Sequence, residues 1–244
     1  MSYILGIDAS SGELGIGLAD EDRGLLGVSR YMRNSHAEHI SQTIEFLFAT
    51  CAVKAPEIGY IALAVGPGSF TGLRIGISFI KGFCFNREVK VMPVSSLESA
   101  ACAWNDREKP IAVAFDARND EVFWARFTPR GDTLVRTRDD ALTPISRFRD
   151  SLEKGDIIIT DTLSNAKSTV FNFLKETPGA YALEKFPVQR GLSCARLAIR
   201  AKKDPSRWGI AAEIMPQYLS ITTMEKRLAG KAAEEEKVQH HESH

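Results

Sequence analysis

One stretch, residues 60–85, limits the possible fold more than any other part of the chain. It begins with an unbroken apolar run, Tyr60-Ile-Ala-Leu-Ala-Val65, which is typical of a strand buried on both faces of a sheet. Gly66-Pro-Gly68 then ends the strand, because glycine allows unusual backbone angles and proline cannot donate to a β-ladder. Ser69 or Thr71 can cap a helix that runs to about the end of the stretch.

The helix in this stretch is predicted to be apolar on two sides. Residues at helical spacing should face a sheet on one side: Leu73, Ile77, Ile80 and Cys84. The opposite side is not polar either and carries Gly72, Ile75, Phe79 and Phe83. Such a helix needs two burying surfaces, so either a second layer of this chain or another chain must cover the second side.

The order of strand, glycine-rich turn and helix allows three interpretations. One is a phosphate cradle, since backbone N–H groups at a helix start attract anions, but no Gly-Lys-Ser/Thr follows. Another is a dinucleotide fingerprint, but Gly66-x-Gly68-x-x-x-Gly72 has one residue too many. The third is a tight turn whose helix packs closely on its neighbours, and the spacing alone favours it over phosphate binding.

Gly66-Pro-Gly-Ser-Phe-Thr-Gly-Leu-Arg-Ile-Gly76 resembles the signature of the TsaB (YeaZ) family. Two further stretches resemble the same family: Phe115-Asp-Ala-Arg-Asn-Asp-Glu-Val-Phe-Trp-Ala125 and Pro216-Gln-Tyr-Leu219. The resemblance spans most of residues 1–220 and implies a protein that assists threonylcarbamoylation of tRNA. It also implies a partner, TsaD, which acts with the ATPase TsaE to transfer threonylcarbamoyl to the adenosine 3′ of the anticodon (t6A formation).

Composition and charge indicate a globular protein without a bulk affinity for nucleic acid. The 244 residues are 44% hydrophobic and 25% charged, and 31 basic residues balance 31 acidic ones. This balance argues against tight, unaided nucleic-acid binding, but it is compatible with a local basic patch. The cysteines have no metal-ligand spacing, and no stretch approaches the ~20 apolar residues of a membrane span. We therefore expect a soluble, reduced, cytoplasmic protein with no cofactor and no membrane partner.

The chain is predicted to contain one series of eight elements twice. Three strands precede alternating helices and strands, first up to about Trp104 and again from Ile111. The registers agree, because Asp8-Ala9 matches Asp116-Ala117 at an offset of 116 − 8 = 108. This internal duplication suggests two α/β domains of the ribonuclease H-like, actin-type ATPase (ASKHA) architecture, and the family resemblance implies the same fold. The predicted divisions are a first domain at 1–106, a second at 107–222 and a disordered charged tail at 223–244.

Local signals predict where individual elements begin and end. Ser35-x-x-Glu38 and Ser95-x-x-Glu98 are capping boxes that open two helices of the first half. The second half is predicted to contain a strand at Thr133–Arg136, a helix with Pro144 in its first turn, a helix at Asn165–Lys175 and a last helix at Ser193–Lys203. Residues 204–220 are less regular and are expected to return to the body of the protein.

The turns that bind phosphate in actin-type ATPases are predicted to be degenerate here. The corresponding cleft would contain Asp8, Ser10, Ser11 and Asp116. The first turn has the small residues and the carboxylate that a phosphate and Mg²⁺ require. The second turn has Arg118 and Asn119 where glycine would allow close approach, and Asp161-Thr-Leu-Ser164 also lacks glycine. We therefore expect both aspartates to stabilise turns at strand ends.

Other catalytic sites have little support in the sequence. His36 and His39 lie three residues apart at a helix start, whereas the resemblance implies a His-x-x-x-His metal motif in TsaD. All other histidines lie in the tail, so a Ser-His-Asp hydrolase is disfavoured and no metal site is expected. An ATP-dependent enzyme of the same fold, such as a small kinase, is the main alternative, and an M22-type peptidase is a weaker one.

We predict a non-catalytic partner of TsaD. Its two N-terminal helices would form the interface with TsaD, and the same surface can form a homodimer when TsaD is absent. TsaE and tRNA would be reached through the complex. The predicted partner-binding residues are His39, Thr43, Phe46, Ser69, Phe70, Gly72, Ile75, Gly76, Phe79 and Phe83.

Overall fold

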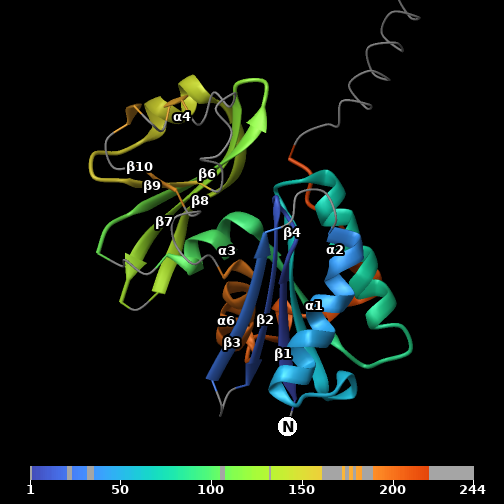
Figure 1. Ribbon diagram of the computed structural model, residues 1–244. Helices are drawn as coiled ribbons and strands as arrows, with labels where there is room; N and C mark the ends of the chain where they lie inside the picture. Colours follow the sequence, from blue (N-terminus) through green and yellow to red (C-terminus); the bar gives the residue numbers. More distant parts are fainter. Residues whose placement is uncertain are drawn as a thin grey trace, which may run out of the picture.

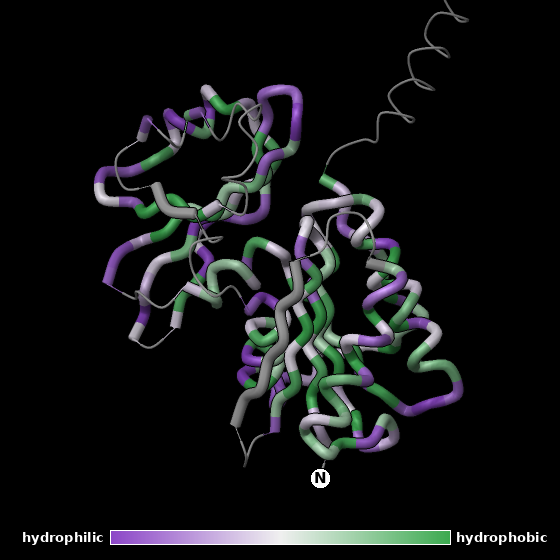
Figure 2. Tube along the Cα trace, in the orientation of Figure 1, coloured by the Kyte–Doolittle hydropathy of each residue, from purple (hydrophilic) through white to green (hydrophobic). Residues whose placement is uncertain are grey.

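The computed structural model contains two β-sheets with helices packed on their faces (Figure 1). The first half of the chain forms most of one lobe, and most of the second half forms the other (Figure 1). The structure describes residues 2–20, 24–31, 36–104, 108–131, 133–160, 172–173, 176–177, 180–182 and 189–219, and of residues 24–31, 36 and 180–182 it describes the backbone alone. Figure 2 shows hydrophobic residues along the strands of both sheets, with hydrophilic segments at the connections. Each lobe therefore has a core built on its own sheet.

The first sheet has six strands in the order β11-β5-β4-β1-β2-β3. β1 pairs in parallel with β4 and antiparallel with β2, while β5 continues the parallel side. The bounds are β1 Tyr3–Asp8, β2 Glu13–Asp20, β3 Gly24–Tyr31, β4 Ile58–Gly66, β5 Lys90–Ser95 and β11 Gly209–Ile210. β4 contains the apolar run predicted to be a buried strand, and six of its nine residues, from Ile61 onward, are buried without interruption.

The second sheet repeats the topology of the first without its β11. Its order is β10-β9-β6-β7-β8, with β7 and β8 antiparallel and β9 and β10 parallel. The bounds are β6 Ile111–Arg118, β7 Glu121–Arg130, β8 Thr133–Pro144, β9 Ile157–Thr160 and β10 Ala180–Ala182. The starts of β1 and β6 differ by 111 − 3 = 108 positions, as do those of β2 and β7 by 121 − 13 = 108. The predicted α/β class is confirmed, and a duplication would produce this repeated topology.

The helices place apolar sides on both faces of each sheet. On the first sheet, α1 and α2 join the core on one face and α6 joins the core on the other. On the second sheet, α3 packs against one face and α4 against the other. The bounds are α1 His36–Cys51, α2 Phe70–Phe83, α3 Ser96–Ala103, α4 Ile145–Ser151 and α6 Arg190–Ala201, with 3₁₀ turns η1 Ala55–Glu57, η3 Pro205–Arg207 and η4 Ala211–Glu213.

Glycine lets α6 approach the first sheet at backbone distance. A Cβ atom on Gly6 would lie 2.0 Å from the carbonyl oxygen of Gly191, and one on Gly17 would lie 2.5 Å from the Cα atom of Leu192. Larger residues at either position would push the helix away. α6 thus follows the second sheet in the chain but packs on the first sheet, and it ties the two halves together.

Four predicted boundaries are corrected by the structure. β8 does not end at Arg136 but runs to Pro144, and α6 begins at Arg190 instead of Ser193. α2 ends at Phe83, before the predicted end near Phe85. Pro144 is the N-cap of α4 and not its first helical residue.

Residues 204–219 return to the body as predicted, and β11 adds a strand to the edge of β5. Several other predictions concern residues that lie wholly or mostly outside the described ranges. They are the helix cap at Ser35, the domain boundary at 106/107, the turn at Asp161–Ser164, most of the helix at Asn165–Lys175 and the charged tail.

Candidate functional site

The turn after β1 is closed by a buried network around Asp8. The Oδ1 atom of Asp8 accepts hydrogen bonds from the Ser10 backbone N–H at 2.9 Å and from its hydroxyl at 2.6 Å. The Ser99 hydroxyl, from α3, lies 3.0 Å from the other carboxylate oxygen. Asp8 therefore stabilises its own turn, as predicted, and also connects that turn to α3.

Arg190 completes this network from the first turn of α6. Its Nε atom lies 3.6 Å from Asp8 Oδ2, and the two side chains are 3% and 0% exposed. Its guanidinium also donates to the Ser11 hydroxyl and lies 5.5 Å above the ring of Phe115 in the second sheet. A buried carboxylate is stable only when it is paired and hydrogen-bonded, and Arg190 supplies that pairing. A guanidinium is thus the cation that lies next to the Asp8 carboxylate.

Cys194 lies one turn further along α6 and is fully buried. Burial and the negative charge of Asp8 both raise the pKa of its thiol. A thiol kept neutral in this way is a weak nucleophile, so Cys194 acts as a small core residue.

The glycine-rich turn packs directly on the turn that carries Asp8. A Cβ atom on Gly68 would lie 2.2 Å from the carbonyl oxygen of Ser10, and one on Gly72 would lie 2.0 Å from that of Ala9. The Ser69 N–H donates to the Ser10 carbonyl at 2.7 Å, and the Ser69 hydroxyl caps α2 by accepting from the Gly72 N–H at 3.2 Å. The close-packing interpretation is thus confirmed, since these glycines make room for protein backbone.

The second turn keeps its shape without glycine. The Arg118 backbone N–H donates to Asp116 Oδ1 at 2.7 Å, so Asp116 also stabilises its own turn. Arg118, Asn119 and Asp120 have φ values of 67°, 52° and 60°, a region that non-glycine residues rarely adopt. Asp8 and Asp116 therefore have the same local role, but only Asp8 is fully buried.

The second apolar side of α2 is covered in part by this chain. The rings of Phe79 and Phe83 stack at 6.1 Å, and Phe83 lies 6.5 Å from Phe48 of α1. Both rings pack against the core and remain half-buried. The sequence left open whether this chain or a partner chain covers this side of α2. Helix α1 of this chain covers part of it, and a partly exposed apolar surface remains.

The predicted partner-binding residues fall into two groups. Some are exposed at least in part: His39, Phe46, Ser69, Phe70, Ile75, Phe79 and Phe83. Others are buried within the chain: Thr43, Gly72 and Gly76. At Gly72 the covering comes from this chain, because the backbone of Ala9 packs against it. Phe46 has the most exposed aromatic side chain of the first group, at 62% exposure.

The C-terminal segment joins the start of α2, which the sequence did not indicate. The Gln217 N–H donates to the Val65 carbonyl at 2.7 Å. Tyr218 stacks on Phe70 at 5.1 Å, and its hydroxyl accepts from the Nε atom of Arg74 at 3.0 Å. The segment around Pro216–Leu219 and the glycine-rich stretch, far apart in the sequence, are thus neighbours.

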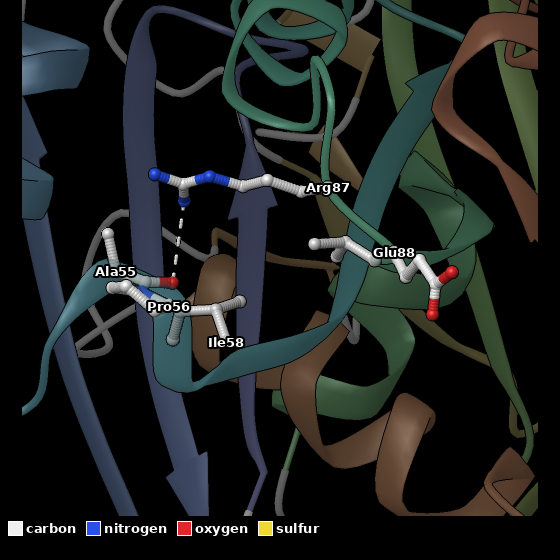
Figure 3. A pocket seen from close by; sticks show the side chains of 6 residues that line it. Ala55, Pro56, Ile58, Arg87 and Glu88 are labelled. Carbon is white, nitrogen blue, oxygen red and sulfur yellow. Dashed lines mark hydrogen bonds between the residues drawn. The ribbon is translucent and has the colours of Figure 1, made fainter.

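One hollow of about 310 Å³ lies away from these turns. It is lined by Ala55, Pro56, Ile58, Arg87, Glu88 and Val89. Arg87 Nη1 donates to the Ala55 carbonyl across it at 3.4 Å (Figure 3). The hollow adjoins the amino ends of β4 and β5, whereas ligands of open α/β sheets bind beyond the carboxyl ends of strands.

Within the described part of the chain, no three His, Cys, Asp or Glu side chains form a group that could hold a metal ion. His39 contacts Gln42, with its Nδ1 atom 3.3 Å from the amide oxygen. Among the described helices, none has the length and hydrophobicity needed to span a membrane.

The contacts of Arg190, Ser99 and Tyr218 were not identified from the sequence. Arg190 lies in the first turn of a helix, where its positive charge opposes the helix dipole, and this unfavourable position is a sequence signal for a nearby anion. Tyr218 lies in the late stretch that resembles the family, but its contact with Arg74 spans 144 positions, and the contact of Ser99 with Asp8 spans 91.

Comparisons with known proteins agree on one family. Residues 29–218 match the family model described as "TsaD: tRNA N6-adenosine threonylcarbamoyltransferase". The tRNA threonylcarbamoyladenosine biosynthesis protein TsaB of Bacillus subtilis (strain 168) is 28% identical over 153 residues, which is 63% of this chain and 67% of that protein. TsaB of Escherichia coli (strain K12) is 34% identical over 94 residues, or 38% of this chain and 41% of that protein. YeaZ from Pseudomonas aeruginosa superimposes with a TM-score of 0.73 at 25% identity, covering 90% of this chain and 100% of that one.

Proposed function

The chain belongs to the threonylcarbamoyltransferase family matched above and, within it, to the TsaB (YeaZ) group, and we propose that it is a non-catalytic partner of TsaD. The chain takes part in tRNA threonylcarbamoyladenosine biosynthesis. In the proposed division of roles, TsaD carries out the transfer to tRNA in the cytoplasm, TsaE hydrolyses ATP, and this chain contributes a binding surface.

The buried pair of Asp8 and Arg190 is the observation that carries this proposal. Mg²⁺ binds through carboxylate oxygens and water, and the Asp8 carboxylate is already occupied by Arg190, Ser10 and Ser99. The glycines that would let a backbone cradle a phosphate are in contact with protein backbone instead. Both features favour a structural role for the turn over nucleotide chemistry.

The remaining apolar surface of α1 and α2 supports a partner. Phe46 is 62% exposed, and Ile75, Phe79 and Phe83 are half-buried on the neighbouring helix. Burying a side chain of this size at an interface contributes roughly 1.5–3 kcal/mol. We propose that TsaD covers this surface in the complex and that a second copy of this chain covers it otherwise.

Co-purification with TsaD from the same organism tests the proposal. We expect the two proteins to elute together. With threonylcarbamoyl adenylate supplied as the donor, we expect t6A to form only when TsaD, TsaE and this chain are all present. The isolated chain should hydrolyse no ATP. Hydrolysis that disappears in Asp8→Ala would instead favour the kinase alternative, and t6A formation at full rate without this chain would refute the partner role.

A further inference from the structure

Four basic residues form a line along the outer side of α6 and the 3₁₀ turn that follows it. We call them the basic stripe: Arg196, Arg200, Lys203 and Arg207. Arg196 and Arg200 are four positions apart and lie on one side of α6, whereas Lys203 and Arg207 follow beyond the end of that helix at Ala201. Arg196 is half-exposed, and the other three are exposed.

The stripe faces away from the first sheet. The opposite side of α6 is buried against that sheet through Cys194, Ala195, Ala198 and Ala201. In Figure 2, hydrophilic and hydrophobic segments alternate along α6, as this two-sided arrangement requires. α1 and α2 lie on the other face of the sheet (Figure 1), so the stripe stays accessible when a partner covers those two helices.

The charge of the stripe is local and largely uncompensated. Residues 196–207 contain five basic side chains and one acidic one, a net charge of 5 − 1 = +4, in a chain whose total is zero. The ion pairs formed among the described residues involve none of the four stripe residues. The acidic residue, Asp204, accepts hydrogen bonds from the hydroxyl and N–H of Ser206, which lower the pKa of that carboxyl, and the charge of Arg207 lowers it further.

Aromatic side chains lie at the carboxyl end of α6. Trp208 meets Tyr60 edge to face at 5.0 Å, and its Nε1 atom donates to the Ala201 carbonyl at 3.0 Å. Lys202 Nζ lies 5.3 Å above the Tyr60 ring. Basic side chains interleaved with partly exposed rings are typical of surfaces that bind the backbone and unstacked bases of RNA.

We propose that the basic stripe binds the phosphate backbone of RNA, and that the RNA is the tRNA substrate of the complex. From Arg196 to Arg200 the helix rises about 6 Å, and Lys203 and Arg207 extend the stripe beyond the end of α6. With the phosphate spacing of one strand of duplex DNA, about 3.4 Å along the axis, as a guide, the stripe is long enough to face more than one phosphate. The identity of the RNA rests on the proposed function, whereas the stripe itself does not.

Salt-dependent tRNA binding by the full-length chain tests this. Binding of unmodified tRNA is measured by fluorescence anisotropy between 50 and about 200 mM salt, a range in which phosphate contacts change affinity strongly. Replacing two stripe residues, Arg200→Gln with Lys203→Gln, should weaken binding and reduce the slope of log K against log salt by about two. The matched control, Arg147→Gln with Lys154→Gln, removes the same charge from exposed positions in the second lobe and should leave both quantities unchanged.

Two outcomes would overturn the assignment to RNA. One is tRNA binding that is absent at low salt or equally strong in the stripe variant and the wild type. The other is binding to phosphatidylserine vesicles that exceeds tRNA binding and is lost in the stripe variant. Co-purification with TsaD is scored separately with the same variants, so a stripe that binds tRNA in a chain that does not bind TsaD would refute the proposed function alone.

Discussion

Arg190 and Asp8 meet in the interior, with the guanidinium Nε atom 3.6 Å from the carboxylate Oδ2 atom. Arg190 begins the helix that follows the second sheet, whereas Asp8 ends the first strand of the first sheet. The Arg190 guanidinium also lies 5.5 Å above Phe115 of the second sheet. One buried ion pair thus connects the first sheet, the second sheet and the helix that returns between them.

Replacing Arg190 by methionine should destabilise the protein strongly. The substitution keeps most of the side-chain volume but leaves the Asp8 carboxylate buried without its cation. Removing one partner of a buried pair typically costs about 3–5 kcal/mol. Urea denaturation followed by circular dichroism measures the loss.

A double variant separates the pair from general packing. Asp8→Asn with Arg190→Met removes both charges, so it should lose less stability than the sum of the two single variants. If the midpoint of urea unfolding is the same for Arg190→Met and the wild type, the ion pair does not hold the two halves together.

Two glycines of α2 should respond in opposite ways to alanine. A Cβ atom on Gly72 would lie 2.0 Å from the Ala9 carbonyl, so Gly72→Ala must move α2 or the turn that carries Asp8. Gly82 has nothing within 4 Å of such an atom, and Gly82→Ala should stabilise the helix by roughly 0.5–1 kcal/mol. Melting temperatures of the two variants provide the comparison. Equal stability of Gly72→Ala and the wild type would contradict the close packing of the two turns.

Local signals identified most elements, because they act within a few residues. Ser95 caps α3 by accepting from the Glu98 N–H at 3.3 Å, as the sequence predicted. β9 occupies Ile157–Thr160, a short apolar run of the kind that favours a buried strand. The turn roles of Asp8 and Asp116 were also correct, because an aspartate after a strand bonds to the backbone two residues on.

The features that the sequence did not reveal depend on distant partners. The predicted strand stopped at Arg136, before the charged part of β8, but β8 is an edge strand, where charged side chains are common. There Arg136 pairs with Asp140 and Glu98, and Arg138 lies 4.3 Å above the ring of Trp124. The last helix was predicted to start at Ser193, but Ser193 is buried inside α6, which begins at Arg190. The contacts of Arg136 with Glu98 and of Arg138 with Trp124 join different elements, whereas Asp140 lies only four positions from Arg136.

Two shortened chains test how the C-terminal part contributes. Ending the chain after Glu213 removes the buried Ile214 and the hydrogen bond from Gln217 to Val65. The loss of the Ile214 side chain alone should cost roughly 1.5–3 kcal/mol, measured as a lower melting temperature. Ending the chain after Thr223 should leave the melting temperature unchanged, because the residues beyond it are highly charged and include almost no large apolar side chains. A drop of several degrees in this longer form would show that the tail docks on the body.

Carboxylates introduced on α1 and α2 should separate folding from partner binding. Leu73 is 1% exposed, so Leu73→Asp buries a charge and should unfold or severely destabilise the monomer. Phe46 is 62% exposed, so Phe46→Asp should cost the monomer only about 0.5 kcal/mol or less. Ile75→Asp, at a half-buried position, should fall between these two in stability.

Phe46→Asp and Ile75→Asp should both abolish co-elution with TsaD and any homodimer seen by size-exclusion chromatography, because a carboxylate in a closed apolar interface loses its hydration. Phe85→Asp is the matched control, since Phe85 is 83% exposed, follows the end of α2 and lies outside the predicted partner residues. The control should retain both assemblies. If Phe46→Asp and Ile75→Asp give wild-type yields of the TsaD complex, the interface lies elsewhere on the molecule. If all three variants lose the complex equally, the effect is not specific to the surface of α1 and α2.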